Sequence, residues 1–155
     1  MAEARRPIHF VIDASVSVKW RLLDEHDVIA ADAILRDLLA DRIRLLAQEH
    51  IRFEVPNALR RAQRTGRLPA VEARPAVKES LTWGIQPFAS DELVLSAFDM
   101  SSNLGCSFND GLHVALAHAT QCPLTYADAR LRNALGDRFP LAIWIADYES
   151  APIGR

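Results

Sequence analysis

Residues 8–13 read IHFVID, a short run of β-prone side chains that ends at an aspartate. A run in which almost every residue is apolar is typical of a strand buried on both faces, as the strands of parallel sheets are. Asp13 then follows directly after the carboxyl end of this strand. In open α/β sheets, ligands bind beyond the carboxyl ends of the strands. This stretch therefore predicts both a fold class and the edge of the sheet at which a functional site lies.

Strands and helices alternate along the rest of the chain. A helical stretch is expected to begin soon after Ser15, and longer helices are expected at residues 27–39, 51–64, 70–83, 90–104, 110–119 and 128–135. Further strands are expected at 44–47, 85–88, 123–126 and 141–145. Helices placed between strands predict a central parallel sheet covered on both faces. We therefore expect a three-layer α/β/α sandwich, formed as a single domain by residues 1–155.

Two sets of apolar side chains are predicted to lie in the core. The helix over residues 27–39 is expected to pack through a stripe made of Ile29, Ala33, Leu35 and Leu38. Tryptophan is more often a core residue than a base-stacking platform, and this applies to Trp20, Trp83 and Trp144.

The composition is that of a soluble globular protein: half of the 155 residues are hydrophobic and 25 % are charged. The net charge of −2 argues against a binding module that holds nucleic acid by bulk charge, but not against an enzyme with a short basic surface. Cys106 and Cys122 are expected to stay unpaired, because a helix between them would hold them roughly 24 Å apart. No long apolar run predicts a membrane span, and residues 1–6 precede no apolar signal core, so a cytoplasmic location is expected.

Four acidic residues stand where such a fold places chemistry. Asp13 and Asp128 follow predicted strands, whereas Glu54 and Asp110 lie at predicted helix starts. Each of them alone has a purely structural interpretation, since Asp is favoured as a helix N-cap and Glu in a first helical turn.

Together, the four carboxylates would repel one another if they met at one end of the sheet. Such a cluster needs raised pKa values or a bound cation. Mg²⁺ and Mn²⁺ prefer oxygen ligands, and Mg²⁺ often shares its coordination sphere with substrate phosphate oxygens. This arrangement is that of metal-assisted phosphodiester hydrolysis. Composition and periodicity leave both interpretations open.

Four segments resemble a known family. Residues 11–20, VIDASVSVKW, resemble the opening of PIN-domain toxins of the VapC type. Three further segments of this chain resemble the family's remaining motifs and stand in the family's order. They are EVPNAL at residues 54–59, FNDGLHVALA at 108–117 and LTYADARL at 124–131. One such segment would be a weak signal, but four in order over nearly the whole chain are specific.

The resemblance implies a PIN-type α/β/α fold and an endoribonuclease that hydrolyses RNA phosphodiester bonds with Mg²⁺ or Mn²⁺. It implies a toxin of a type II toxin–antitoxin pair, with a cognate antitoxin as partner and a homodimer as assembly. The implied catalytic carboxylates are Asp13, Glu54, Asp110 and Asp128, of which Asp13, Asp110 and Asp128 would bind the metal, with the hydroxyls of Ser15 and Thr125 orienting carboxylates.

The chain departs from the family pattern at three positions. Gly111 and His113 replace the more usual Ala and Tyr, which is expected to alter the substrate groove, and Pro56 is expected to reshape the helix start at Glu54. His113 itself is expected to have a surface or packing role, with contact to RNA as the alternative, and its five-residue spacing from His118 is poor for a shared zinc ion.

Arginines cluster along and after the helix that carries Glu54, at Arg52, Arg60, Arg61, Arg64 and Arg67. A solvated helix face is the preferred explanation of the cluster, and contact with substrate phosphates is the alternative, with Arg60 and Arg64 as the selected candidates. Two other functions stay open. One is a PIN nuclease that acts in RNA processing without being a toxin, and the other is an inactive PIN-like binding or scaffold protein.

Overall fold

The computed structural model of the chain describes residues 7–150, and its centre is a five-stranded parallel sheet with the strand order β3-β2-β1-β4-β5. The strands are β1 (Ile8–Ile12), β2 (Ile43–Gln48), β3 (Gln86–Phe88), β4 (Leu124–Tyr126) and β5 (Ala142–Trp144). In register, Val11 of the central strand pairs with Leu46 on one side and Leu124 on the other. The predicted parallel sheet is confirmed. Residues 1–6, about which the sequence makes a targeting prediction, and residues 151–155 lie outside the described part.

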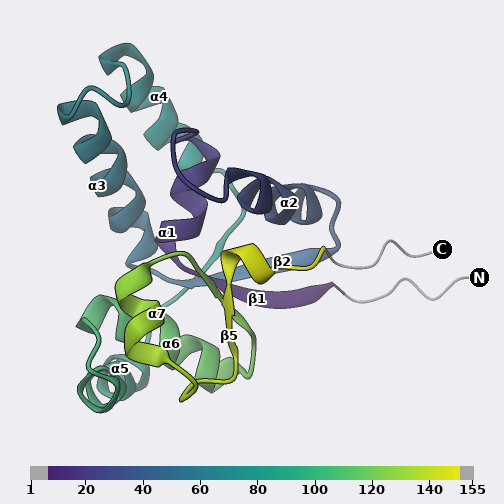
Figure 1. The fold of residues 1–155 in the computed structure, drawn as a ribbon, viewed down its shortest axis with the longest axis vertical. Coiled ribbons are helices and arrows are strands. Elements are labelled where there is room, and N and C mark those ends of the chain that lie inside the picture. Colours follow the sequence, from purple (N-terminus) through teal and green to yellow (C-terminus); the bar gives the residue numbers. More distant parts are fainter. Residues whose placement is uncertain (1–6, 151–155) are drawn as a thin grey trace, which may run out of the picture.

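Helices cover both faces of the sheet (Figure 1). The helices, including the short 3-10 turns η1 and η2, are α1 (Ala14–Ser17), η1 (Val18–Trp20), α2 (Val28–Leu39), α3 (Ile51–Arg64), α4 (Ala70–Ser80), α5 (Asp91–Leu104), α6 (Phe108–Thr120), α7 (Ala129–Leu135) and η2 (Ile145–Asp147). The first four α-helices pack on one face, and α5 to α7 pack on the other. The fold is therefore the three-layer α/β/α sandwich that the sequence predicts.

Side chains of β1 alternate between the two cores. Phe10 and Ile12 join the core beneath α1 to α4, whereas Val11 joins the core beneath α5 to α7. The last three residues of the strand are buried, while its first residue, Ile8, is 46 % exposed. The buried half of β1 is thus the half that ends at Asp13, which fixes that aspartate at the carboxyl edge of the sheet.

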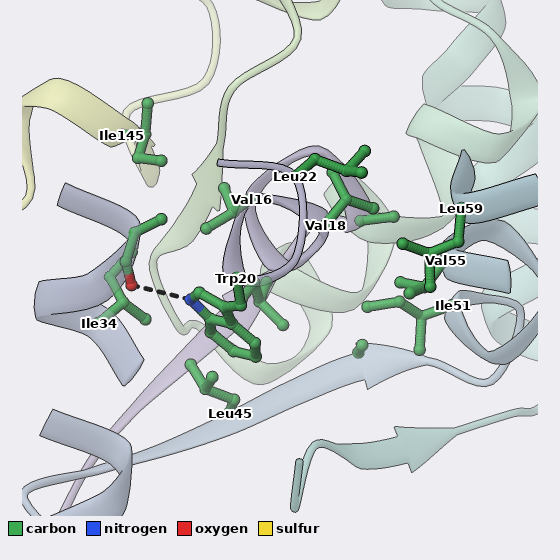
Figure 2. Close-up of a cluster of buried hydrophobic side chains, with 14 of the residues drawn as sticks. Val16, Val18, Trp20, Leu22, Ile34, Leu45, Ile51, Val55, Leu59 and Ile145 are labelled. Atoms are coloured by element: carbon green, nitrogen blue, oxygen red, sulfur yellow. Dashed lines mark hydrogen bonds between the residues drawn. The ribbon is translucent and has the colours of Figure 1, made fainter. Parts of the chain in front are cut away.

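Trp20 holds the segment after β1 against the first core (Figure 2). Its indole Nε1 donates a hydrogen bond of 2.8 Å to the carbonyl of Ala31 in α2, and its ring meets Trp83 edge-on with centroids 4.8 Å apart. Trp20 is a core residue as predicted, and Trp83 and Trp144 are partly buried against the cores. These contacts fix α1 and η1, the elements that begin directly after Asp13.

The predicted apolar stripe of α2 is confirmed only in part: Leu38 is buried and Leu35 packs against the core, but Ile29 does not. The buried side chains of this helix include Ala31, Ile34 and Leu38, whereas Ile29 is 83 % exposed. Apolar residues occupy several faces of α2, so periodicity alone does not select the face that packs.

Two further features of the described residues bear on the class of protein. Cys106 and Cys122 are free thiols. None of the helices within residues 7–150 combines the length and the apolar character that a bilayer span requires.

Candidate metal and active site

The carboxyl ends of the neighbouring strands β1 and β4 lie side by side. After β1 the chain continues to β2 on one side of this pair, and after β4 it continues to β5 on the other side. Such a switch point is where open α/β sheets bind ligands. A pocket of about 480 Å³ opens here, and α1 packs against α3 beside it (Figure 1). The pocket is lined by all four carboxylates singled out in the sequence, Asp13, Glu54, Asp110 and Asp128, together with Ser15, Val18, Ala14, His50, Phe53, Asn57, Ala58, Arg61 and Asn109.

Asp13 is both a helix cap and a pocket residue. Its Oδ2 accepts hydrogen bonds from the backbone amide of Ser15, at 3.2 Å, and from the Ser15 hydroxyl. The bond from the amide makes Asp13 the N-cap of α1. Its Oδ1 lies 3.4 Å from Nε2 of His113. The side chain is buried, with 5 % of its surface exposed. The structural and functional interpretations of Asp13 are therefore compatible, because one carboxylate oxygen serves each.

Ser15 and Thr125 differ from each other in what they touch. The Ser15 hydroxyl donates to Asp13 and also accepts a 2.9 Å hydrogen bond from the amide of Ala127, so it ties α1 to the segment after β4. Thr125 is fully buried, and its hydroxyl donates to the carbonyl of Val11 at 3.2 Å. The expectation that Thr125 contacts a carboxylate is thus wrong, because its side chain bridges β4 to β1 inside the sheet.

Glu54 reaches the site from α3, which continues through Pro56 to Arg64 without a break. Its Oε2 accepts a 3.0 Å hydrogen bond from Nε2 of His113, since a carboxylate can only accept. One ligand atom from each of Asp13, Glu54 and His113 lies within 4.8 Å of the other two. The proline therefore does not displace Glu54 from the pocket.

His113 is the site residue that the sequence reasoning missed. It is 1 % exposed, so of the expected surface or packing role the surface part is wrong, and it contacts two of the carboxylates. Residues 110 and 113 lie on one face of a helix, so their spacing was the available signal. Burial alone would lower the pKa of His113, but the hydrogen bond to Glu54 and the charges of Asp13, Glu54 and Asp110 raise it above its ordinary value.

Asp110 occupies the first turn of α6. The Ser107 hydroxyl caps this helix by accepting from the amide of Asp110 at 3.1 Å, and it donates to the Asp110 carboxylate at 2.7 Å. Burial raises the pKa of Asp110, the Ser107 hydrogen bond opposes this, and the charges of Asp13 and Asp128 raise the pKa further. The pocket thus holds more negative charge than its own residues neutralise.

Asp128 caps α7 with one carboxylate oxygen. Its Oδ1 accepts from the amides of Arg130, at 2.7 Å, and Leu131, at 3.3 Å. As with Asp13, the capping contact fixes the side chain at the pocket edge and leaves a second oxygen to face it.

Gly111 does not line the pocket. A Cβ added to Gly111 would lie 2.7 Å from the carbonyl oxygen of Ala97 and 2.8 Å from Cβ of Ser101, both on α5. The glycine therefore allows α5 and α6 to approach closely.

The predicted phosphate-contacting arginines are not the ones that reach the site. Arg60 donates a 3.0 Å hydrogen bond to Gln63 and lines a different pocket near α4. Arg64 is exposed and does not line the acidic pocket either. Arg61, one residue further along the helix than Arg60, does line it. A shift of one residue turns a helical side chain by about 100°, which is why the cluster alone could not identify the residue.

The donor set of the pocket fits a hard divalent cation. Its carboxylates supply oxygen atoms, which Mg²⁺ and Mn²⁺ prefer, while Nε2 of His113 is already bonded to Glu54. Burial is the main reason that the pKa of Asp110 is raised, and the charges of Asp13 and Asp128 add to it; a bound cation would offset both.

Comparisons with known proteins identify the fold and the family of the chain. Among solved structures, the chain is similar to the crystal structure of PAE2754 from Pyrobaculum aerophilum, with a TM-score of 0.64 and 18 % sequence identity over 90 % of this chain and 92 % of that chain. At that identity the likeness shows the fold alone. A search of curated proteins finds no match. The PIN domain family model matches residues 10–135. The chain therefore belongs to the PIN domain family, whose members are in general metal-dependent nucleases.

Proposed function

We propose that this protein is an endoribonuclease that uses Mg²⁺ or Mn²⁺ to hydrolyse RNA phosphodiester bonds. The observation that carries the proposal is that four carboxylates, far apart in sequence, line one pocket at the switch point of the sheet. The fold and the family supply the class of enzyme, a metal-dependent nuclease. The choice of RNA follows the resemblance of the four sequence segments to toxins that cleave RNA.

Each acidic residue has a proposed role that its contacts support. Asp13, Asp110 and Asp128 would hold the cation, since all three face the pocket and two of them are fixed by helix-capping contacts. Ser15 would orient Asp13 through its hydroxyl. When bound, the metal would polarise a phosphoryl oxygen and lower the pKa of a coordinated water.

Glu54 is proposed as the fourth catalytic carboxylate, placed by His113. The histidine is wholly buried, so its 3.0 Å hydrogen bond sets the position of the Glu54 carboxylate against the pocket. A fixed carboxylate beside the cation can position a water molecule or accept a proton.

The biological setting is also a proposal and rests on the resemblance. We propose that the protein is the toxin of a toxin–antitoxin pair in the cytoplasm, that it forms a homodimer, and that residues 1–155 make a single domain.

The proposed activity predicts cleavage of single-stranded RNA by the purified protein with Mg²⁺ or Mn²⁺. Excess EDTA should stop the reaction, and added Mn²⁺ should restore it, because the carboxylates alone provide no Lewis acid. The measurement is the appearance of fragments from end-labelled oligoribonucleotides of mixed sequence. Cleavage that persists in EDTA would rule out a metal-dependent mechanism. Metal binding without cleavage of any RNA would favour the scaffold alternative.

A further inference from the structure

One face of α3 forms a wall of the acidic pocket. The residues of this face recur three or four positions apart, which is the spacing of a single helical stripe, and all of them line the pocket: His50, Phe53, Glu54, Asn57 and Arg61. Glu54 belongs to the carboxylate cluster. The other four, here named the α3 stripe, have no part in the proposed chemistry and supply two rings, an amide and a cation beside it.

Phe53 is exposed although it is large and apolar. Its exposed fraction is 68 %, and its ring lies 6.1 Å from that of His50, centroid to centroid, with the two planes tilted by 46°. Single exposed apolar side chains are common on protein surfaces. This one differs because it borders a polar pocket directly beside Glu54. An exposed aromatic ring next to a nuclease site presents a flat surface on which an unpaired base can stack.

Within residues 7–150, the positive charge of Arg61 has no acidic partner. Its guanidinium makes no hydrogen bond or ion pair with any residue from 7 to 150, whereas Arg67 is paired with Asp24 and Glu25. Arg61 is seven residues beyond Glu54, which is about 10 Å along the helix axis. A free guanidinium at that distance from the carboxylates suits a phosphate that neighbours the one to be cleaved, because Arg recognises phosphate with several donors at once.

We propose that the α3 stripe binds single-stranded RNA beside the carboxylates, with Phe53 stacking on a base and Arg61 contacting a flanking phosphate. The inference rests on the proposed function and specifies the form of its substrate. Phe53 can stack only on a base that is not already stacked and paired in a duplex. The stripe therefore favours single strands over double helices, and it lies along α3, which leads away from the sheet (Figure 1).

The test measures binding apart from cleavage. The protein carries Asp13→Asn so that the RNA stays intact, and fluorescence anisotropy follows a labelled single-stranded oligoribonucleotide at several salt concentrations. Phe53→Ala should weaken binding about 10-fold and Phe53→Tyr should retain it. Phe98→Ala is the matched control, because Phe98 on α5 is 65 % exposed and does not line the pocket. A duplex of the same sequence should bind more weakly and should not respond to Phe53→Ala.

The charged half of the proposal has its own readout. Arg61→Gln should weaken binding and reduce the slope of log K against log salt by about 0.7, the value for one phosphate contact on a single strand. Arg60→Gln, the neighbouring position on the same helix, should leave the slope unchanged, because Arg60 faces the other pocket.

Three outcomes would overturn the inference. The first is that Phe53→Ala weakens RNA binding no more than Phe98→Ala does. The second is that Arg61→Gln and Arg60→Gln give the same slope of log K against log salt. The third is that Phe53→Ala changes the oligomeric state and leaves the RNA affinity unchanged. The last would make the stripe a protein interface. Failure of the proposed function is seen separately, as absence of cleavage by the unmodified protein, whatever the binding results are.

Discussion

Replacing Asp13 by asparagine is expected to lower RNA cleavage by more than about 100-fold with little change in melting temperature. Loss of a group that merely orients a metal ligand costs about 10–100-fold, and a direct ligand should cost more. The fold should survive, because asparagine is as good an N-cap as aspartate and can accept the same hydrogen bonds from Ser15. The carboxamide is nearly isosteric but lacks the charge that attracts a cation.

The measurement pairs cleavage rates with thermal unfolding of the same samples. Asp99→Asn is the matched control, because Asp99 is an exposed aspartate on α5 outside the pocket. If Asp13→Asn cleaves RNA as fast as Asp99→Asn does and melts at the same temperature, Asp13 is a helix cap and nothing more.

Replacing Trp20 by alanine is expected to reduce the free energy of unfolding by about 3–5 kcal/mol, the range for a buried Trp truncated to Ala. Small domains have about 5–15 kcal/mol in total, so this is a large share. Trp20 is 7 % exposed, and the change would remove its edge contact with Trp83 and leave the Ala31 carbonyl without its 2.8 Å donor. The elements that follow Asp13 would lose their main anchor (Figure 2).

Urea unfolding at equilibrium measures this effect. Leu23→Ala should change stability by at most about 0.5 kcal/mol, because Leu23 is 71 % exposed. Trp20→Phe should fall between the two, since it keeps an aromatic ring but loses the hydrogen bond. A loss below about 1 kcal/mol for Trp20→Ala would mean that the core relaxes around the missing ring and that Trp20 does not anchor this segment.

The order of the elements could be predicted because their boundaries are strong local signals. Helix α3 begins and ends where the sequence predicts, and α5 has its Ser90 cap and its Gly105 stop. The packing face of α2 could not be predicted in this way, since apolar residues occur on several of its faces and tertiary contacts select among them. In α6 the whole stretch from Gly111 to Ala117 is buried, so the helix has no polar face from which periodicity could be read.

The candidate site was predictable to the extent that backbone position determines it. Asp13 and Asp128 follow strands that prove to be neighbours, so their meeting at one edge follows from the topology. His113, Arg61 and Thr125 could not be placed because their roles depend on which way a side chain points. His113 bonds to Glu54 and Thr125 bonds to Val11, partners that are remote in sequence and that periodicity does not identify.

The central claim is that the pocket carboxylates form a divalent-metal site, and titration calorimetry with Mn²⁺ tests it most directly. The folded-state pKa of Asp110 is raised above its ordinary value of 3.8, so between these two values the metal-free folded protein holds more proton at Asp110 than the unfolded chain does. The stability that this proton contributes is complete below the ordinary value and is lost as pH rises through the raised one. Metal binds the ionised carboxylates and competes with that proton. We therefore predict saturable Mn²⁺ binding that is stronger at about pH 7.5 than at about pH 4, close to the ordinary pKa of an aspartate, and that is lost in Asp13→Asn. Absence of saturable binding, or an affinity that is the same at both pH values and in the variant, would contradict a metal site built from these carboxylates.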